Sequence, residues 1–189
     1  MINIDIQKRV EINKNTILVN GIESFSYTEN NDFNLFIKSI YKSLNINYPK
    51  FYKMSNLCKL GFIASEVLLK DINLTSIDKN KVGVILSNFS SSLQIDIEYQ
   101  NTIKNIPSPG VFVYTLPNII TGEICIRNGF RGEELFLIQK NFNKEFIFNY
   151  VENLFIEGNT TLCISGWVEF DSLGIYHADL YLLKKITLK

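Results

Sequence analysis

Histidine and cysteine are scarce in this chain of 189 residues, which has one histidine, His177, and three cysteines. Cys58, Cys125 and Cys163 are odd in number and far apart, which fits neither a disulfide framework nor a closely spaced metal cluster. Because zinc usually takes three or four ligands, we expect no metal and no other cofactor. We predict that the thiols are reduced and mostly buried, and that only Cys58, early in a helix, is a candidate for reactivity.

An excess of charge is also absent, since 19 basic and 19 acidic side chains give a formal net charge of zero. No strong general field therefore attracts nucleic acid or an anionic membrane. The apolar runs are shorter than a membrane span, and the first 15 residues, MINIDIQKRVEINKN, lack the apolar core of a signal peptide. We expect a cytoplasmic protein with neither nucleic acid nor membrane as a partner.

The residues that are abundant favour a globular protein. Hydrophobic residues make up 46% and aromatic residues 13% of the chain, enough for one domain over 1–189 to bury a core. Apolar spacing alternates between the periods of strands and helices, which indicates the α/β class. The pattern predicts a strand or strand pair over 2–22, a helix over 33–44 capped by Asn31 or Asp32, a helix from about Ser55, and a strand over 81–86.

The stretch 108–143 has the most specific pattern. A strand-like run, Leu135-Phe136-Leu137-Ile138, leads into a candidate helix that ends at Gly158. A strand-to-helix corner presents backbone N–H groups and the positive end of a helix dipole, and enzymes place nucleophiles there. This corner reads Gln139-Lys140-Asn141-Phe142-Asn143, and a carboxamide cannot be ionised to a nucleophile.

Several motifs in this stretch occur in a known order. They are Ser108-Pro109, Leu116-Pro117-Asn118, Ile124-Cys125-Ile126-Arg127 and Gly129-Phe130-Arg131-Gly132. Together they resemble the N-terminal half of β-ketoacyl synthases, of the thiolase-like superfamily. In that family the strand after the last glycine ends at the catalytic cysteine, and counting without a gap from Gly132 puts this position on Asn141. A full synthase would continue beyond Lys189 into a second half that supplies catalytic histidines.

The resemblance implies a fold, namely a thiolase-like half-fold with a mixed sheet of about five strands, helices on both faces and a C-terminal hairpin. The hairpin would consist of strands over 160–170 and 176–183 joined by a turn at 171–174. Over 90–104 the alternation of apolar residues predicts a strand, whereas four-residue spacings, three preceding serines and the resemblance favour a helix. We favour the helix.

For the site, the resemblance implies no catalytic residue and a degenerate pocket formed by Gln139, Lys140, Asn141 and Asn143. In chain-length factors, the inactive partners of ketosynthases, the cysteine is also replaced by an amide residue, usually glutamine. Asn141 then either hydrogen-bonds an acyl carbonyl or lies in a decayed, solvated corner, and both interpretations stay open. Structural roles are expected for four other positions: Asn118 as a helix cap, Gly129 and Gly132 in turns, and Cys163 in the core.

The function implied is that of an inactive, ketosynthase-like accessory protein in fatty-acid, polyketide or pigment biosynthesis. It would pair through the strand Leu135, Phe136, Leu137 and Ile138, as a homodimer or with an active ketosynthase, and assist an acyl carrier protein. One alternative is an active 3-oxoacyl synthase, acyltransferase or thioesterase that uses Cys58, Cys125 or His177. We expect a packed Cys125 and a surface or edge His177 instead. The other alternative is a protein that binds an acyl chain in the abandoned cavity.

Overall fold

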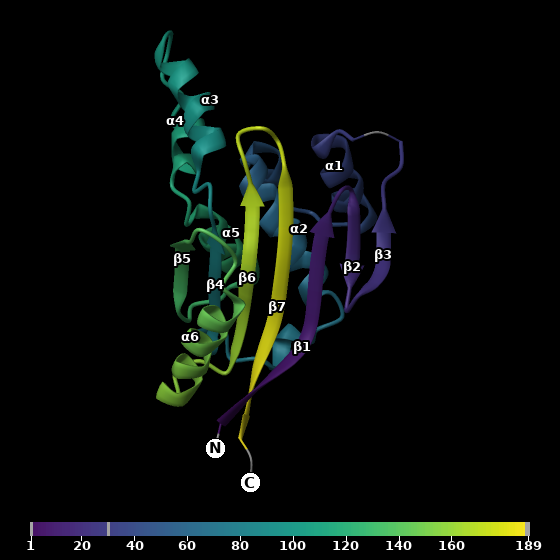
Figure 1. The fold of residues 1–189 in the computed structure, drawn as a ribbon, viewed down its shortest axis with the longest axis vertical. Coiled ribbons are helices and arrows are strands. Elements are labelled where there is room, and N and C mark those ends of the chain that lie inside the picture. Colours follow the sequence, from purple (N-terminus) through teal and green to yellow (C-terminus); the bar gives the residue numbers. More distant parts are fainter. Residues whose placement is uncertain (1, 30, 188–189) are drawn as a thin grey trace.

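Within residues 2–29 and 31–187, which the computed structural model describes, a mixed sheet of seven strands runs through the protein (Figure 1). Its order is β3-β2-β1-β7-β6-β4-β5, with β4 parallel to both of its neighbours and the other pairs antiparallel. The strands are β1 (Ile2–Asn13), β2 (Thr16–Val19), β3 (Ile22–Ser26), β4 (Val82–Asn88), β5 (Glu134–Ile138), β6 (Leu162–Phe170) and β7 (Tyr176–Thr187).

The predicted number of about five strands is wrong because the N-terminal segment makes three strands. Tight turns at Lys14-Asn15 and Asn20-Gly21 reverse the chain, and all four residues have positive φ angles, between 45° and 80°. Such turns match the twist of antiparallel strands. Asn20-Gly21, at the end of the segment predicted as a strand or strand pair, is a strong hairpin signal, and the third strand follows it.

Helices cover both faces of the sheet, as predicted, with α6 on one face and α1, α2 and α5 on the other (Figure 1). The Asp32 carboxylate accepts the Leu35 N–H at 3.0 Å, which confirms the predicted cap, and the Ser55 hydroxyl accepts the Cys58 N–H at 3.3 Å at the predicted start of the next helix. The α-helices are α1 (Phe33–Ser43), α2 (Asn56–Leu69), α3 (Leu93–Ile103), α4 (Pro109–Phe112), α5 (Ile119–Asn128) and α6 (Lys144–Glu157). Short 3-10 helices are η1 (Pro49–Lys53), η2 (Leu74–Ser76), η3 (Lys79–Lys81) and η4 (Val113–Thr115).

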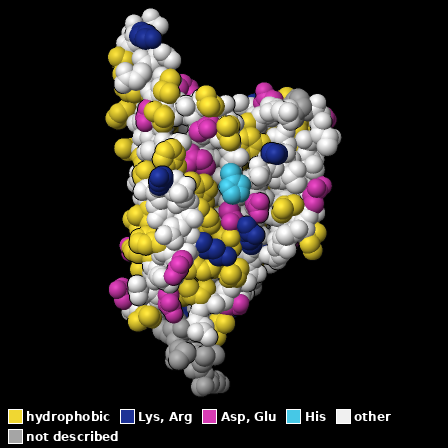
Figure 2. All heavy atoms as spheres, viewed as in Figure 1, with side chains coloured by type: hydrophobic (Ala, Val, Ile, Leu, Met, Phe, Trp, Pro, Cys, Tyr) yellow, Lys and Arg dark blue, Asp and Glu magenta, His cyan; other side chains and the backbone are white. Residues whose placement is uncertain are grey.

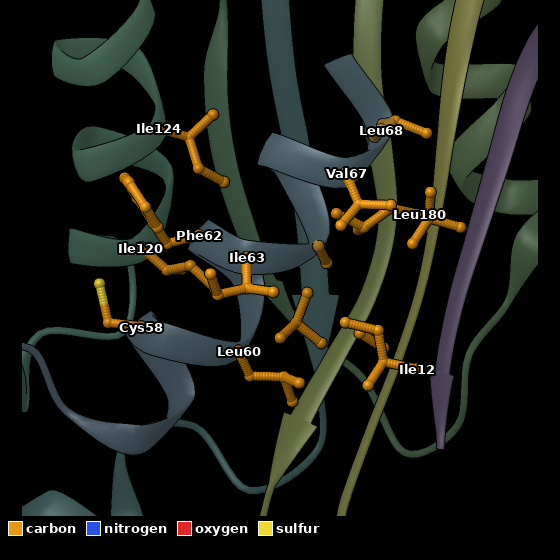
Figure 3. Close-up of a cluster of buried hydrophobic side chains, with 14 of the residues drawn as sticks. Ile12, Cys58, Leu60, Phe62, Ile63, Val67, Leu68, Ile120, Ile124 and Leu180 are labelled. Carbon is orange, nitrogen blue, oxygen red and sulfur yellow. The ribbon is translucent and has the colours of Figure 1, made fainter. Parts of the chain in front are cut away.

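The larger core lies between the sheet and helices α1, α2 and α5. Figure 3 shows α2 side chains directed both toward the sheet and toward Ile120 and Ile124 of α5. Gly61 permits this close packing, because a Cβ atom there would overlap the Ile120 side chain. The smaller core lies under α6 and contains Ile85, Ile147, Val151, Phe155, Cys163, Tyr181 and Leu183.

Residues 89–118, which we call the arm, extend from the body and contain α3, α4 and η4 (Figure 1). The helix favoured over 90–104 is therefore present as α3. Its cap differs from the expected serine cap, because Ser92 occupies the N-cap position while its hydroxyl donates to the Thr115 carbonyl at 2.6 Å. That hydrogen bond joins the two ends of the arm.

The predicted C-terminal hairpin is confirmed as β6 and β7, which pair from Phe170 and Tyr176 onward. Asp171 closes the turn by accepting the N–H groups of Leu173 and Ile175, both at 2.8 Å. In the described part of the chain no single helix is long and apolar enough to cross a membrane. One bent pair, Pro109–Thr115 with Ile119–Asn128, passes by length and composition alone.

Candidate functional site

The corner between β5 and α6 contains the residues to which the sequence pattern points. β5 lies at the edge of the sheet, and the Gln139 N–H donates to the Asn88 carbonyl at the end of β4 at 2.8 Å. This hydrogen bond holds the corner beside the C-terminal end of the neighbouring strand. Asn141 is exposed in the middle of the bend, as is Lys140. The bend therefore presents an amide to the solvent at the start of a 14-residue helix.

Asn143 is already used by the helix. Its side-chain oxygen accepts the Phe146 N–H at 3.0 Å, which satisfies one of the free donors at the start of α6. The next residue, Lys144, places a cation at the positive end of the helix dipole, where it is electrostatically unfavourable. Its Nζ lies 4.4 Å from the Tyr181 ring centre and 5.0 Å from that of Phe148, so two aromatic faces offset this cost.

Two buried oxygens on the α6 side of the sheet, Gln139 Oε1 and Ser165 Oγ, have no hydrogen-bond partner among the described residues. A neighbouring hydroxyl, Ser87 Oγ, donates to the Gly166 carbonyl at 3.2 Å. Buried polar atoms are usually paired, because an unpaired one costs about 1–3 kcal/mol. Gln139 is thus the corner residue with unused hydrogen-bonding capacity. The sequence pattern predicted Gln139 as part of a site, but it did not indicate Ser87 or Ser165.

Glu169 is another residue that the sequence interpretation did not assign to a site. Its carboxylate accepts the N–H groups of Phe89 and Ser90, at 2.7 and 3.2 Å, where β4 passes into the arm. Charged acceptors make strong bonds of this kind. The sequence signal was an acidic residue near the end of a predicted buried strand. Glu169 fixes the base of the arm to β6.

The three thiols lie away from the corner. Cys58 is 2% exposed, and burial raises its pKa well above the ordinary value. Burial and the Glu134 carboxylate raise the pKa of Cys125 to about 12, and burial also raises the pKa of Cys163. All three are protonated near neutral pH, and a thiol needs to ionise to act as a nucleophile. The prediction of mostly buried thiols is confirmed, and the selection of Cys58 as a reactive candidate is wrong.

His177 lies on the surface of β7, a central strand, so the edge position considered for it is wrong. Its Nε2 is 3.9 Å from a Glu11 carboxylate oxygen on the neighbouring strand β1. It is the cyan side chain of Figure 2, on the same face of the sheet as α6, in the part of that face that α6 leaves open. Among the described residues, no three His, Cys, Asp or Glu side chains form a group that could hold a metal ion.

The glycines of the motif have different structural roles. Gly129 ends α5 with a φ of 70°, as a turn requires. Gly132 instead packs against β4, because a Cβ atom there would lie 2.5 Å from the Val82 carbonyl oxygen. Asn118 occupies the N-cap position of α5 without a side-chain cap bond, so its expected capping role is only positional.

Comparisons with known proteins give matches at the level of structure. No protein-family model and no curated protein matches the sequence. The ishigamide ketosynthase/chain length factor is similar with a TM-score of 0.66 and 15% identity, over 96% of this chain and 62% of that one. A type II polyketide synthase acyl-carrier protein in complex with its ketosynthase gives a TM-score of 0.65 and 14% identity, over 96% and 62%.

A ketosynthase in complex with its chain length factor from Xenorhabdus doucetiae is also similar. Its TM-score is 0.65 at 12% identity, over 96% of this chain and 78% of that one. The chain therefore spans about three fifths of the length of the first two structures. At these identities the matches confirm the fold, which is the thiolase-like fold of the β-ketoacyl synthases.

Proposed function

We propose that this chain is a chain-length-factor-like accessory protein. It pairs with an active ketosynthase and does not itself catalyse the condensation of acyl groups. Its pathway would make fatty acids, polyketides or related pigments on an acyl carrier protein. The observation that carries the proposal is a strand with a free edge that leads directly into a corner without a nucleophile, at Asn141. The similar solved structures, which include ketosynthases with a chain length factor or a carrier protein, support this class of partner.

The free edge of β5 has a defined hydrogen-bonding pattern. The Glu133 carbonyl and the Gln139 N–H bond to β4, at 2.8 Å each, so odd-numbered residues face that strand. Alternation then directs the backbone groups of residues 134, 136 and 138 outward, where another strand can pair. Because β5 is apolar and Ile138 is 52% exposed, pairing would also remove hydrocarbon from water.

The arm adds apolar surface along the same side of the molecule. Figure 1 shows α3 and α4 beyond the end of β5, on the same side. Large contiguous patches of exposed apolar side chains are typical of protein interaction sites. Its exposed residues are Phe89, Leu93, Ile97, Ile103, Ile106, Phe112, Val113 and Leu116. We infer that β5 and the arm together form the surface that contacts the ketosynthase.

Pairing through β5 can be tested with Ile138→Pro. Proline removes an outward N–H and is tolerated on an edge strand, so the fold should persist while the pairing is lost. Ile138→Ala, which keeps the N–H, is the matched control. Light scattering of mixtures with a ketosynthase from the same organism should give a heterodimer for the unmodified chain and for Ile138→Ala. Separate monomers of the unmodified chain and the ketosynthase, or a homodimer that excludes the ketosynthase, would contradict the proposal.

Asn141→Cys tests the corner separately. In the unmodified chain we expect no adduct with an acyl-thioester analogue at pH 7, because all three thiols have raised pKa values. In the variant, a thiol exposed near a helix N-terminus should be acylated at residue 141, as mass spectrometry would detect. A stoichiometric adduct on Cys58 or Cys125 of the unmodified chain would instead favour an enzyme.

A further inference from the structure

A cavity of about 600 Å³ lies at the end of the sheet opposite the corner, where β4 and β6 begin and β7 ends. The seven residues of β4 separate the two ends by roughly 20 Å, at the usual rise per residue. Figure 1 shows this end of the sheet near the chain termini. The cavity is therefore separate from the corner and uses none of the residues assigned to ketosynthase pairing.

The cavity wall is held together by the main chain. The Thr161 N–H donates to the Lys81 carbonyl, and the Lys185 N–H donates to the Thr161 carbonyl, both at 2.9 Å. Lys184 pairs in register with Leu162 across β6 and β7. These contacts bring Lys81, from the middle of the chain, and Lys184 and Lys185, from near its C-terminal end, to one edge of the sheet, so their backbone positions are already organised.

The charge of the wall is positive, although the whole chain is neutral. No ion pair within the described residues includes Lys81, Lys184 or Lys185. Lys185 Nζ donates to the Phe155 carbonyl at the end of α6, which partly occupies it. Asp78 is the one acidic residue of the wall, and its Oδ1 already accepts the backbone and side-chain N–H groups of Asn80, both at 3.0 Å. The ammonium groups of Lys81 and Lys184, which have no ion pair in the described residues, could therefore bind an anion.

The rest of the wall has hydrocarbon and neutral polar groups. Its apolar side chains are Ile72, Ile77, Leu162 and Leu182, and its neutral polar ones are Gln7, Asn73, Ser76 and Thr161. A cavity of this size falls in the range of small-molecule sites, which combine apolar walls with a few polar anchors. The wall therefore combines cationic anchors with hydrocarbon.

We propose that this cavity binds a small amphipathic anion, a carboxylate or phosphate group attached to a short hydrocarbon chain. Lys81 and Lys184 bind the head group, and the isoleucine and leucine side chains contact the hydrocarbon. A free fatty acid and an alkyl phosphate ester both have this chemistry. The proposal is independent of the pairing with a ketosynthase.

Calorimetric titration of the full chain tests the proposal with octanoate, octyl phosphate, octanol and inorganic phosphate. We expect one or both amphipathic anions to bind more tightly than octanol and than inorganic phosphate. The anion that binds more tightly identifies the source of the ligand. In Lys81→Gln/Lys184→Gln the affinity for that anion should fall about tenfold, since hydrogen bonds to charged groups are worth about 1.5 kcal/mol or more. Lys38→Gln/Lys104→Gln removes two exposed charges elsewhere and should bind normally.

A second measurement uses the unmodified chain, so it does not depend on folding of the variants. Methyl resonances of Ile77, Leu162 and Leu182 should shift on titration with the tighter anion, while that of Ile138 should not. Equal binding by octanol, unchanged affinity in the lysine variant, or methyl shifts confined to β5 and the arm would overturn the proposal.

Discussion

The two faces of the sheet differ in the surroundings that they provide for charged side chains. The face covered by α1, α2 and α5 carries the larger apolar core, whereas α6 leaves much of the other face open to solvent (Figure 2). On the open face, Arg9 donates to both carboxylate oxygens of Asp179, at 2.7 and 3.0 Å, and Tyr181 donates to one of them at 2.8 Å. The hydrogen bond to Asp179 is the main cause of the raised pKa of Arg9.

The covered side also contains charge, but gathers it at one buried carboxylate. Glu123 is 2% exposed and accepts the Tyr48 hydroxyl at 3.1 Å, while Lys50 Nζ lies 2.5 Å from its other oxygen. Burial, followed by the neighbouring Cys58 and Glu123, raises the pKa of Tyr114 at the base of the arm. Both carboxylates are buried, at 2% and 5% exposed, and both have several donors. Arg9 on the open face is partly solvated, however, and can lose its carboxylate at a lower cost than a buried donor can.

Removal of a large core side chain should distinguish the faces most strongly. Phe62→Ala, in fully buried α2, should lower the free energy of unfolding by about 3–5 kcal/mol, because it leaves a cavity. Phe148→Ala, in the half-buried part of α6, should cost about 1 kcal/mol. Urea unfolding measures both. Similar losses would mean that α6 is packed as tightly as α2.

Removal of the central carboxylate compares the two polar groups directly. Glu123→Ala should cost about 3 kcal/mol, since buried partners lose their acceptor, and Asp179→Ala about 2 kcal/mol, since Arg9 can be solvated. Glu123→Gln and Asp179→Asn keep an acceptor and should cost less. Urea unfolding measures all four variants. A larger loss of unfolding free energy in Asp179→Ala than in Glu123→Ala would contradict the expectation that the carboxylate under the helices is the more costly one to remove.

Raising the pH above 10 should lower the free energy of unfolding, and we expect this to be the smallest and most gradual of the effects. Burial and Glu123 raise the pKa of Tyr48 to about 12, and burial followed by the Asp179 hydrogen bond raises that of Tyr181. The fold therefore favours neutral tyrosines, whose ordinary pKa is 10.0, so their contribution is complete below pH 10 and declines as pH rises toward 12. Unfolding experiments at several pH values, with tyrosinate absorbance, should show a shallower decline for Tyr181→Phe. If the unfolding free energy of the unmodified chain and of Tyr181→Phe declined equally with pH, ionisation of Tyr181 would not contribute to the loss of stability.

Local patterns predicted much of the fold. The caps at Asp32 and Ser55, the bend at Asn141 and the C-terminal hairpin follow from spacing and turn chemistry within short segments. Alternation over 90–104 pointed to a strand, but a strand needs a neighbour to bond with, and the arm provides none, so α3 forms instead. Cys58 was misjudged because it lies where α2 packs against α5, an element far along the chain, and no local pattern predicts that contact.

The sequence by itself determined most of the helices and strands, and that the corner contains amides rather than a nucleophile, because both depend on residues close together in the chain. Only the tertiary structure decided which side chains meet. Lys81 and Lys184, which line one cavity, are 103 positions apart, and Tyr48 and Glu123, which share a hydrogen bond, are 75 positions apart. No local period encodes such contacts, because sheet order and helix packing create them.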